Sequence, residues 1–288
     1  MAVRPGAPYL AGAPLLIAHR GGASLAPENT LVAFRQAVEW WRADILELDV
    51  RPTQDGEVVV LHDPTVDRTT DGRGLSRELT LAQVQSLDAG YRFSADGGAT
   101  FPYRGAGLRI PTLAEVLAAF PGHRVNVEIK DVRAGPRVRE VVTEAAATGR
   151  VLLAAEDRAA RLAAGPYAGA TSASSRELRA FYMLHRARLA RRFRPAADAL
   201  QLPRLHRGRE IPSARLVRDA HALNLAVHVW TVDDVHDMHR LLENGVDGIV
   251  TDRPDRLAKV LHERTGRPLP PGPPDEAKRG FLERLLLA

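Results

Sequence analysis

Residues 15–50 read LLIAHRGGASLAPENTLVAFRQAVEWWRADILELDV, in which two short apolar segments flank an amphipathic one. Leu15 to His19 and Ile45 to Val50 have the length and aliphatic content of buried strands in a parallel sheet. Between them, Thr30 to Trp41 carries apolar residues at helical spacing and begins with a residue that can cap a helix. This stretch therefore predicts a strand, a helix and a second strand in succession.

The same alternation resumes after residue 110 and continues along most of the chain. We predict helices at 111–120 and 136–148, and strands at 124–129, 151–155, 169–173, 199–202, 225–232 and 248–251, each strand followed by a helix. Eight such units are the number that closes a TIM (β/α)8 barrel, an α/β fold. A doubly wound open sheet is the alternative, but Arg20-Gly21-Gly22 lacks the spacing of its phosphate-binding turn.

The segment after the second strand departs from this rhythm. Val58 to Leu61, which follows a Gln54-Asp55-Gly56 turn, extends the strand as a hairpin. Residues of about 63–110 are rich in glycine, aspartate, threonine and arginine, with one short helix at 80–87. We interpret them as a small insertion that covers one end of the barrel. Its charged and aromatic residues are expected to form the mouth of the substrate site, namely Arg92, Phe93 and Tyr103.

The proposed domain organisation is a single barrel with two extensions. It comprises an N-terminal extension at 1–14, the barrel at 15–265, and a proline-rich linker with a short C-terminal helix at 266–288. The final helix can dock on the barrel, pair with a partner or touch a membrane. Within the barrel, Trp40 and Trp41 are expected in the core because they close the first helix at helical spacing.

Composition excludes several classes of function. The 288 residues include no cysteine, which rules out disulfide scaffolds, cysteine nucleophiles and cysteine-ligated metal sites. The formal net charge of +5 is local, because twelve arginines lie between Arg176 and Asp219 against four acidic residues. We therefore expect no nucleic-acid partner; this segment forms a solvated surface or recognises an anion or anionic lipid. Its histidines are expected to be exposed: His185, His206 and His221.

The sequence contains no apolar run of the length that spans a bilayer, and its first residues lack the pattern of a signal peptide. These features predict a cytoplasmic location and leave peripheral membrane contact open.

Carboxylates occupy alternate positions in two predicted strands. Glu47-Leu48-Asp49 places two of them on one face of the second strand, and Glu128 lies near the end of the next barrel strand, two residues before Lys130. Buried charges are costly unless they are paired or bound to a metal. The three carboxylates therefore predict either ion pairs with barrel arginines or a site for a hard cation, Mg²⁺, Ca²⁺ or Mn²⁺.

Two histidines lie where a barrel places its active face. His19 ends the first strand and His62 ends the hairpin, and residues at the C-terminal strand ends form the active sites of TIM barrels. Beside a metal site, the pair suggests a general base and a general acid, whereas a lone histidine is more often structural. Asp63 and Asp252 either orient a catalytic side chain or cap a loop, and we leave them outside the predicted site.

Seven motifs, in order, resemble the glycerophosphodiester phosphodiesterase family over about residues 15–260. They are His19-Arg20-Gly21-Gly22, Pro27-Glu28-Asn29-Thr30, Glu47-Leu48-Asp49, His62-Asp63, Glu128-Ile129-Lys130, His228-Val229-Trp230-Thr231 and Asp247-Gly248-Ile249-Val250-Thr251-Asp252. The resemblance implies a TIM barrel with an insertion after its second strand. It also implies hydrolysis of glycerophosphodiesters to an alcohol and sn-glycerol 3-phosphate with one divalent cation, Mg²⁺ or Ca²⁺, with Mn²⁺ as a further candidate.

The same resemblance implies a role for each matching residue. Glu47, Asp49 and Glu128 would bind the metal, His19 and His62 would form the acid-base pair, Arg20 and Lys130 would contact the phosphate, and Trp230 would line the glycerol pocket. The partner is then a small-molecule substrate, and the head group and oligomeric state stay open. A lysophospholipase D acting on lysophospholipids is one alternative. A catalytically silent barrel that binds anionic lipid is another, but it would have an incomplete set of these residues.

Overall fold

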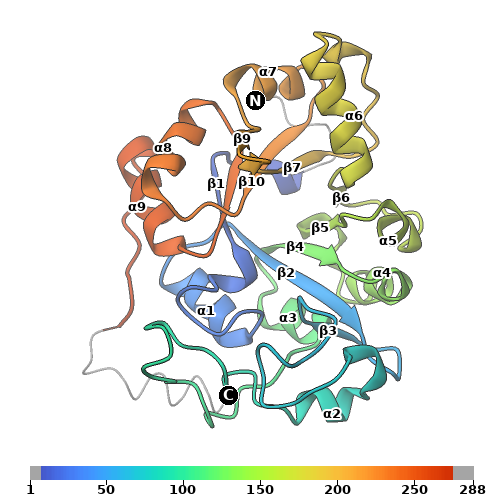
Figure 1. Ribbon diagram of the computed structural model, residues 1–288, viewed down its shortest axis with the longest axis vertical. Helices are drawn as coiled ribbons and strands as arrows, with labels where there is room; N and C mark the ends of the chain where they lie inside the picture. The colour runs from blue at the N-terminus through green and yellow to red at the C-terminus, as the bar shows by residue number, and fades with distance from the viewer. Residues whose placement is uncertain (1–7, 275–288) are drawn as a thin grey trace.

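Eight parallel strands form the centre of the structure, a computed structural model that describes residues 8–274 (Figure 1). In order around the sheet they are β6 (Ala170–Thr171), β5 (Val151–Ala154), β4 (Arg124–Ile129), β2 (Ile45–Pro52), β1 (Leu15–Ala18), β11 (Gly248–Thr251), β10 (Ala226–Trp230) and β7 (Ala199–Pro203). A parallel bridge between Ser172 and Ala199 brings the first and last of them together, so the sheet is a nearly closed barrel. The predicted TIM (β/α)8 fold is confirmed.

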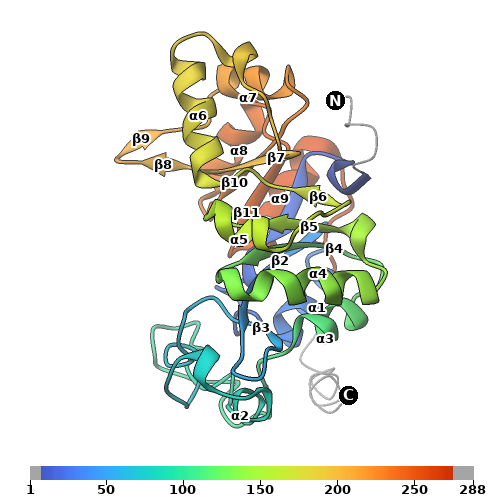
Figure 2. The ribbon, with the colours of Figure 1, turned by 90° about the vertical axis from the view of Figure 1, so that its right-hand side faces the viewer.

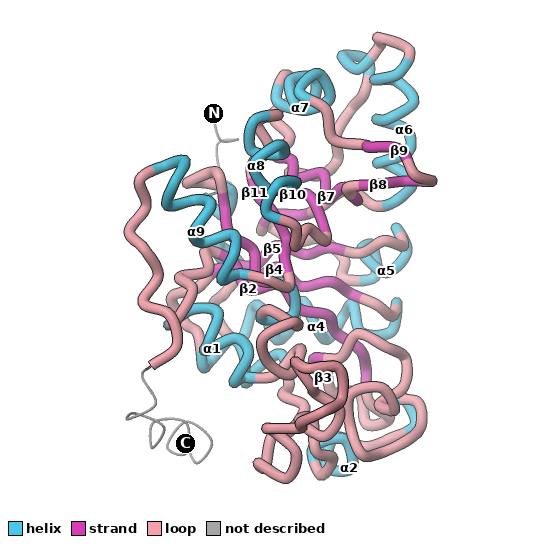
Figure 3. Tube along the Cα trace, turned by 60° about the vertical axis from the view of Figure 1, so that its left-hand side comes forward, coloured by secondary structure: helices cyan, strands magenta, loops and turns pink. Residues whose placement is uncertain are grey.

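Helices surround this ring on the outside (Figure 3). They are α1 (Leu31–Glu39), α3 (Leu113–Ala119), α4 (Gly135–Glu144), α5 (Arg158–Ala163), α6 (Ser175–Arg186), α7 (Ala214–His221), α8 (Val235–Glu243) and α9 (Pro254–Thr265). The side chain of Thr30 caps α1 by accepting a hydrogen bond from the amide of Ala33 at 3.2 Å. The expectation that Trp40 and Trp41 are core residues is wrong: α1 ends at Glu39, and both rings are only half-buried.

Short 3₁₀ turns join several of these elements. They are η1 (Pro8–Leu10), η2 (His19–Gly21), η3 (Ser76–Glu78), η4 (Val132–Ala134), η5 (Thr148–Arg150) and η6 (Ala190–Arg192).

Successive side chains of a strand point to opposite faces of the sheet, so the barrel has one apolar core outside the strands and another inside them. Side chains such as Leu48 and Val127 point outward and pack with helix residues such as Phe34 and Leu117. A smaller apolar cluster fills the N-terminal half of the barrel interior. Besides Ile17 it contains two residues of η1, Tyr9 and Leu10, and the strand residues Leu15, Ile45, Leu152, Ala154, Ala170, Ala199, Ala226 and Val250. The polar inward-facing residues of the strands therefore lie toward the C-terminal end of the barrel.

The predicted insertion follows the second barrel strand and carries a core of its own. It begins after β3 (Val58–Val60), which pairs antiparallel with β2, and it contains the short helix α2 (Leu81–Gln85). Val66, Val84 and Ile110 pack with Leu61 and other apolar residues in this third cluster. Figure 2 shows the insertion as a separate lobe at one end of the molecule.

A two-stranded hairpin, β8 (Leu205–His206) and β9 (Arg209–Glu210), projects beside α6 (Figure 2). Among residues 8–274, none of the helices is both long enough and apolar enough to cross a membrane. The expected C-terminal helix lies beyond residue 274, outside the described residues.

Candidate active site

A tight turn at the end of β1 carries two of the residues that the sequence singles out. Arg20 and Gly21 have φ angles of 50° and 85°, both in the left-handed region. A Cβ atom on Gly21 would lie 2.7 Å from the Cβ of Ala33 in α1, so only glycine fits here. The backbone amide of Arg20 donates a hydrogen bond to Oε2 of Glu47 at 3.0 Å, which ties the turn to β2.

Three carboxylates meet at the C-terminal end of the barrel. Glu47 and Asp49 face inward from β2, where they are 4% and 1% exposed, and Glu128 lies beside them on β4. One oxygen from each lies within 4.8 Å of the others, which is close enough for all three to hold a single ion. An all-oxygen donor set matches the preference of Mg²⁺, Ca²⁺ and Mn²⁺ and lacks the soft ligands of thiolate metal sites.

The electrostatics of this cluster favour a cation. Burial and the charge of Asp49 raise the pKa of Glu47, and burial also raises the pKa of Glu128. Burial acts in the same direction on Asp49, but the nearby ammonium of Lys130 and guanidinium of Arg20 lower its pKa below the ordinary value. A divalent ion would offset the repulsion among the three carboxylates, so the residues present fit such a group.

Both candidate phosphate contacts are anchored on Asp49. The Nε atom of Arg20 lies 3.1 Å from Oδ2 of Asp49, and the Nζ atom of Lys130 lies 3.2 Å from Oδ1. Lys130 also contacts Glu128 Oε1 at 3.0 Å. Two positive side chains are thus held next to the carboxylate cluster, and both border the same cavity.

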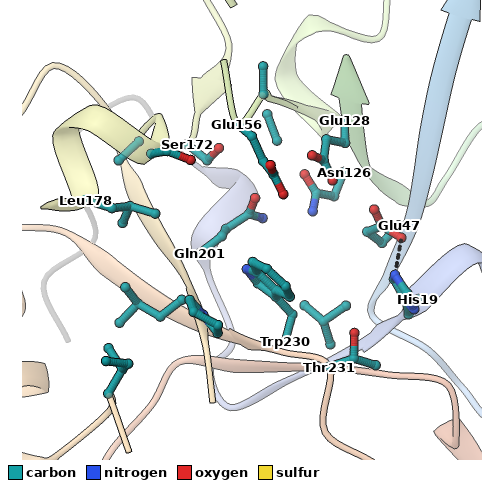
Figure 4. A pocket seen from close by; sticks show the side chains of 18 of the residues that line it. His19, Glu47, Asn126, Glu128, Glu156, Ser172, Leu178, Gln201, Trp230 and Thr231 are labelled. Carbon is teal, nitrogen blue, oxygen red and sulfur yellow. Dashed lines mark ion pairs between the residues drawn. The ribbon is translucent and has the colours of Figure 1, made fainter. Parts of the chain in front are cut away.

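His19 is oriented by a carboxylate from the other end of the chain. Its Nδ1 atom lies 2.7 Å from Oδ1 of Asp252, and its Nε2 atom lies 4.0 Å from Oε2 of Glu47. Burial would lower the pKa of His19, but the hydrogen bond to Asp252 and the charge of Glu47 raise it to about 9. The Nε2 atom is the one left to face the cavity (Figure 4).

His62 is held in a similar way from within its own loop. Its Nδ1 atom lies 2.6 Å from Oδ1 of Asp63, and Arg68 donates to the other oxygen of Asp63 at 2.6 Å. Partial burial acts to raise the pKa of Asp63, but the hydrogen bonds from Arg68 and His62 lower it to about 2. Arg68 also binds Glu28 with bonds of 2.7 and 2.8 Å, and Glu28 in turn accepts a bond from Arg20 at 3.0 Å. The insertion therefore contributes to the site by fixing His62 and Arg20.

A cavity of about 620 Å³ joins these groups. Its inner end is polar and includes His19, Arg20, Glu47, His62, Asn126, Glu128, Lys130 and Gln201, together with Trp230 at the end of β10. Its outer wall is more apolar and comes from α6, the end of β7 and the loop before α7: Leu178, Tyr182, Met183, Leu202, Pro203 and Ile211. Figure 4 shows His19 and Glu47 on one side of this space and Gln201, Glu156 and Trp230 across from them.

The structure thus brings seven of the eight predicted site residues to the cavity wall, with Asp49 beneath them as the partner of Arg20 and Lys130. Their chemical roles stay predictions. Asp63 and Asp252, which we left outside the predicted site, contact its two histidines directly. Asn126, Glu156 and Gln201 were not anticipated; the signal available for Asn126 was its inward position two residues before Glu128.

The prediction that the insertion forms the mouth of the substrate site is wrong. No residue of 63–110 lines the cavity. Tyr103 accepts a hydrogen bond from Gln36 on α1 at 2.9 Å and packs edge-on against Phe93, while Arg92 donates to the carbonyl of Thr70. These residues stabilise the insertion, and α6 provides the outer wall of the cavity instead.

Two histidines of the arginine-rich segment are also not free surface residues. His185 is 6% exposed and bonds Oδ2 of Asp219 at 2.7 Å. His221 is half-buried and bonds Oδ2 of Asp247 at 2.8 Å. We interpret both as structural residues, because a carboxylate of the fold is hydrogen-bonded to one ring nitrogen of each. His206 is exposed as expected and borders the cavity.

Comparison with known proteins agrees with this geometry. Residues 19–256 match the model of the Glycerophosphoryl diester phosphodiesterase family. A protein of Caldanaerobacter subterraneus named Glycerophosphodiester phosphodiesterase is 35% identical over 252 residues, which cover 86% of this chain and 98% of that protein. A protein of Bacillus subtilis with the same name is 30% identical over 253 residues, which cover 85% of this chain and 86% of that protein.

Solved structures share the fold. A glycerophosphoryl diester phosphodiesterase domain from Mycobacterium tuberculosis superposes with a TM-score of 0.76 at 23% identity, covering 88% of this chain and all of that one. A phosphodiesterase of Oleispira antarctica, solved with the product sn-glycerol-3-phosphate, gives a TM-score of 0.65 at 24% identity, with 86% and 97% coverage. From the match of its sequence over most of its length, the chain belongs to the glycerophosphoryl diester phosphodiesterase family.

Proposed function

We propose that the protein hydrolyses glycerophosphodiesters to an alcohol and sn-glycerol 3-phosphate, with residues 15–265 as the catalytic domain. One observation carries the proposal. A single cavity at the C-terminal end of the barrel lies over the cluster of three carboxylates and is bordered by two carboxylate-bound imidazoles and two cationic side chains. Membership in the family supports it, as do the names of the relatives. A silent lipid-binding barrel would not need this complete set.

The charged residues suit a phosphodiester, which carries one negative charge and gains more as the bond to the leaving alcohol breaks. Arg20 and Lys130 would bind the phosphate oxygens, and their ion pairs with Asp49 hold both side chains in place before the substrate arrives. Glu47, Asp49 and Glu128 would bind a divalent cation, Mg²⁺, Ca²⁺ or Mn²⁺, which supplies Lewis-acid stabilisation of the same charge.

The two histidines would move the protons. In each, a carboxylate oxygen accepts a hydrogen bond from Nδ1–H and fixes the ring, so that Nε2 is the atom available to the substrate. One imidazole takes the proton of the attacking oxygen, either water or the 2-hydroxyl of the glycerol group. If the 2-hydroxyl attacks, the product is a cyclic phosphate, and water must then open it to give sn-glycerol 3-phosphate. The other gives a proton to the leaving alkoxide. Proton transfer of this kind contributes roughly 10²- to 10⁴-fold in rate.

A second candidate function is a lysophospholipase D. The outer wall formed by Leu178, Tyr182 and Met183 offers an apolar surface against which an acyl chain can pack. The chemistry would be the same, and the substrates would differ in the chain carried by the glycerol group. Comparing turnover of glycerophosphocholine with that of 1-acyl-lysophosphatidylcholine decides between the two.

The proposed reaction is tested by identifying the phosphorus product. With glycerophosphocholine and Mg²⁺, ³¹P NMR should show sn-glycerol 3-phosphate, together with free choline in an enzymatic assay. Phosphocholine as the phosphorus product would mean that the other ester bond is cut and would contradict the proposal. A preference for lysophosphatidylcholine would favour the second candidate. The cytoplasmic location remains a prediction from the sequence.

A further inference from the structure

The helix that forms the outer wall of the cavity presents arginines and a methionine to solvent. Along α6, four exposed side chains follow one another at intervals of three, four and three residues, so they share one side of the helix: Arg176, Arg179, Met183 and Arg186. Met183 is 68% exposed, the largest exposed fraction of any large hydrophobic side chain in residues 8–274. Arg179 and Met183 also line the cavity, so this side of α6 forms part of its mouth.

The β8–β9 hairpin extends this surface. His206 is exposed and lines the cavity together with Met183. The hairpin also exposes Arg207, Arg209 and Leu205, the last of which is 40% exposed. Figure 2 shows α6 and the hairpin in the half of the molecule away from the insertion. We call the exposed residues of these two elements the rim surface: Arg176, Arg179, Met183, Arg186, Leu205, His206, Arg207 and Arg209.

The positive charge of the rim surface is not neutralised within the described part of the fold. None of its five arginines pairs with a carboxylate among residues 8–274. The acidic residues of the same two elements are bound from elsewhere, because Glu177 accepts two bonds from Arg161 at 2.9 Å and Glu210 pairs with Arg240. Glu156 is the one exposed carboxylate that lines the cavity. The surface therefore carries a net positive charge and attracts an anionic partner.

The apolar side chains of the rim surface favour one kind of anionic partner. At a bilayer, Met183 and Leu205 can enter the acyl region while the arginines stay with the headgroup phosphates. A nucleic acid or a polyphosphate would leave both apolar side chains without a partner. The cavity wall behind the rim is apolar as well, through Leu178 and Tyr182, so the apolar surface continues inward from the mouth. A lipid surface thus matches both the charge and the exposed apolar groups.

We propose that the rim surface binds membranes that contain anionic phospholipid, with its arginines on the headgroup phosphates and with Met183 and Leu205 among the acyl chains. The mouth of the cavity then faces the bilayer, and the apolar wall of α6 extends from the lipid surface into the cavity. The inference goes beyond the proposed reaction and does not depend on it, because exposed residues carry the binding and no turnover is needed.

Sedimentation of the full chain with sucrose-loaded vesicles tests the proposal. Vesicles of phosphatidylcholine alone are compared with vesicles of equal parts phosphatidylcholine and phosphatidylglycerol, at low and at high NaCl concentration. The wild type should bind the anionic vesicles at least about 100-fold more tightly, and salt should weaken this binding. Each arginine near an anionic leaflet strengthens binding about fivefold, so Arg186→Glu combined with Arg207→Glu should lose at least about 25-fold. Met183→Ser should lose about tenfold, because an apolar side chain no longer leaves water.

A matched control combines Arg42→Glu and Arg73→Glu, which change the net charge equally at two exposed arginines outside the rim surface. This variant should bind the anionic vesicles as the wild type does. Equal losses in the two arginine pairs would overturn the proposal, since net charge alone would then explain binding. Undiminished binding by Met183→Ser would also overturn it and would indicate a surface for soluble anions.

The comparison of the two vesicle types by the wild type needs no variant to fold, and equal binding to both would overturn the proposal. Neither Arg186 nor Arg207 lines the cavity, so their double variant should keep the wild-type turnover of glycerophosphocholine while it loses vesicle binding. A wild-type protein that binds anionic vesicles but does not cleave glycerophosphocholine would refute the proposed function and support the membrane surface. Cleavage without vesicle binding would do the reverse.

Discussion

The Nδ1 atom of His19 lies 2.7 Å from Oδ1 of Asp252, although 233 positions separate the two residues in the chain. The strands β1 and β11, the first and last of the chain, pair in parallel and bring the two residues together. Asp252 is itself fixed, because its amide donates to Asp233 at 2.8 Å and Thr251 donates to the same oxygen. The orientation of the His19 ring therefore depends on the pairing of β1 with β11.

We expect Asp252→Asn to lower kcat on glycerophosphocholine by about 10²-fold with little change in KM, since general acid-base catalysis supplies roughly 10²- to 10⁴-fold. Removing the negative charge also lowers the pKa of His19, so the limb of the pH profile that reports this group should move to lower pH. Asp255→Asn is the control, because Asp255, in the first turn of α9, is bound by Arg253 instead of by a histidine. An unshifted pH profile in Asp252→Asn would argue that Asp252 only stabilises the loop.

Metal binding is expected to depend on the carboxylate cluster and not on every acidic group of the cavity. Glu47→Gln should weaken Mg²⁺ or Ca²⁺ binding, measured by isothermal titration calorimetry, at least about 100-fold, because loss of even an outer partner of a metal site commonly costs 10- to 100-fold. Glu156→Gln removes a carboxylate that lines the same cavity but lies outside the cluster, and it should change affinity little. Similar losses in both variants would contradict the assigned ligands.

His228 should make stability depend on pH. Complete burial and the charge of Arg124 lower its pKa to about 4 from an unfolded value of 6.5. Between pH 6.5 and 4 the unfolded chain binds the proton and the folded one does not, so the free energy of unfolding falls as pH falls, by about 3 kcal/mol at full extent. Urea unfolding of wild type and His228→Gln from pH 7 to 4 measures this difference.

The variant at His228 should lose this part of the pH dependence, while His236→Gln on the exposed face of α8 should keep it. Groups other than the two substituted histidines contribute equally to all three proteins, so only the differences between the curves are compared. Parallel curves for wild type and His228→Gln would show that the ring is not held neutral in the fold.

The choice of leaving alcohol should depend on α6. We expect Leu178→Ser to reduce the preference for a hexyl over an ethyl glycerophosphodiester by roughly tenfold in kcat/KM, since apolar pockets discriminate by about 1–3 kcal/mol per methylene. Phe93→Ala, in the insertion, should leave that preference unchanged because Phe93 packs on Tyr103 and not on the cavity. If Phe93→Ala reduced this preference and Leu178→Ser did not, the insertion would form the mouth of the site instead of α6.

Local patterns were sufficient to predict the barrel and the positions of its inward carboxylates. Glu47 and Asp49 share a face because strand side chains alternate, and the strand ends of a TIM barrel converge, so His19 and Glu128 could be placed on one rim from sequence alone. The buried segments of the strands also stand out by their aliphatic content. These features depend only on neighbours along the chain and on the number of repeated units.

Other features depend on contacts that the sequence does not reveal. Helical spacing placed Trp41 in the core, but the helix ends two residues earlier and the chain turns through Arg42, whose φ is 55°. His185 appeared exposed because its neighbours are arginines, yet Asp219 from α7 binds it. Leu178, Tyr182 and Met183 of α6 border the cavity, and the placement of a helix relative to a cavity is not encoded in local periodicity.

The most direct test is the turnover of glycerophosphocholine by the full chain before EDTA treatment, after it, and after Mg²⁺ or Ca²⁺ is restored, with Glu47→Ala and His19→Ala measured alongside. The geometry predicts that EDTA abolishes turnover and that the cation restores it in the wild type. It also predicts that neither variant recovers more than about 1% of the wild-type rate, in line with loss of a catalytic proton transfer. Undiminished turnover in either variant, or after EDTA, would contradict a metal-assisted hydrolysis at this cavity.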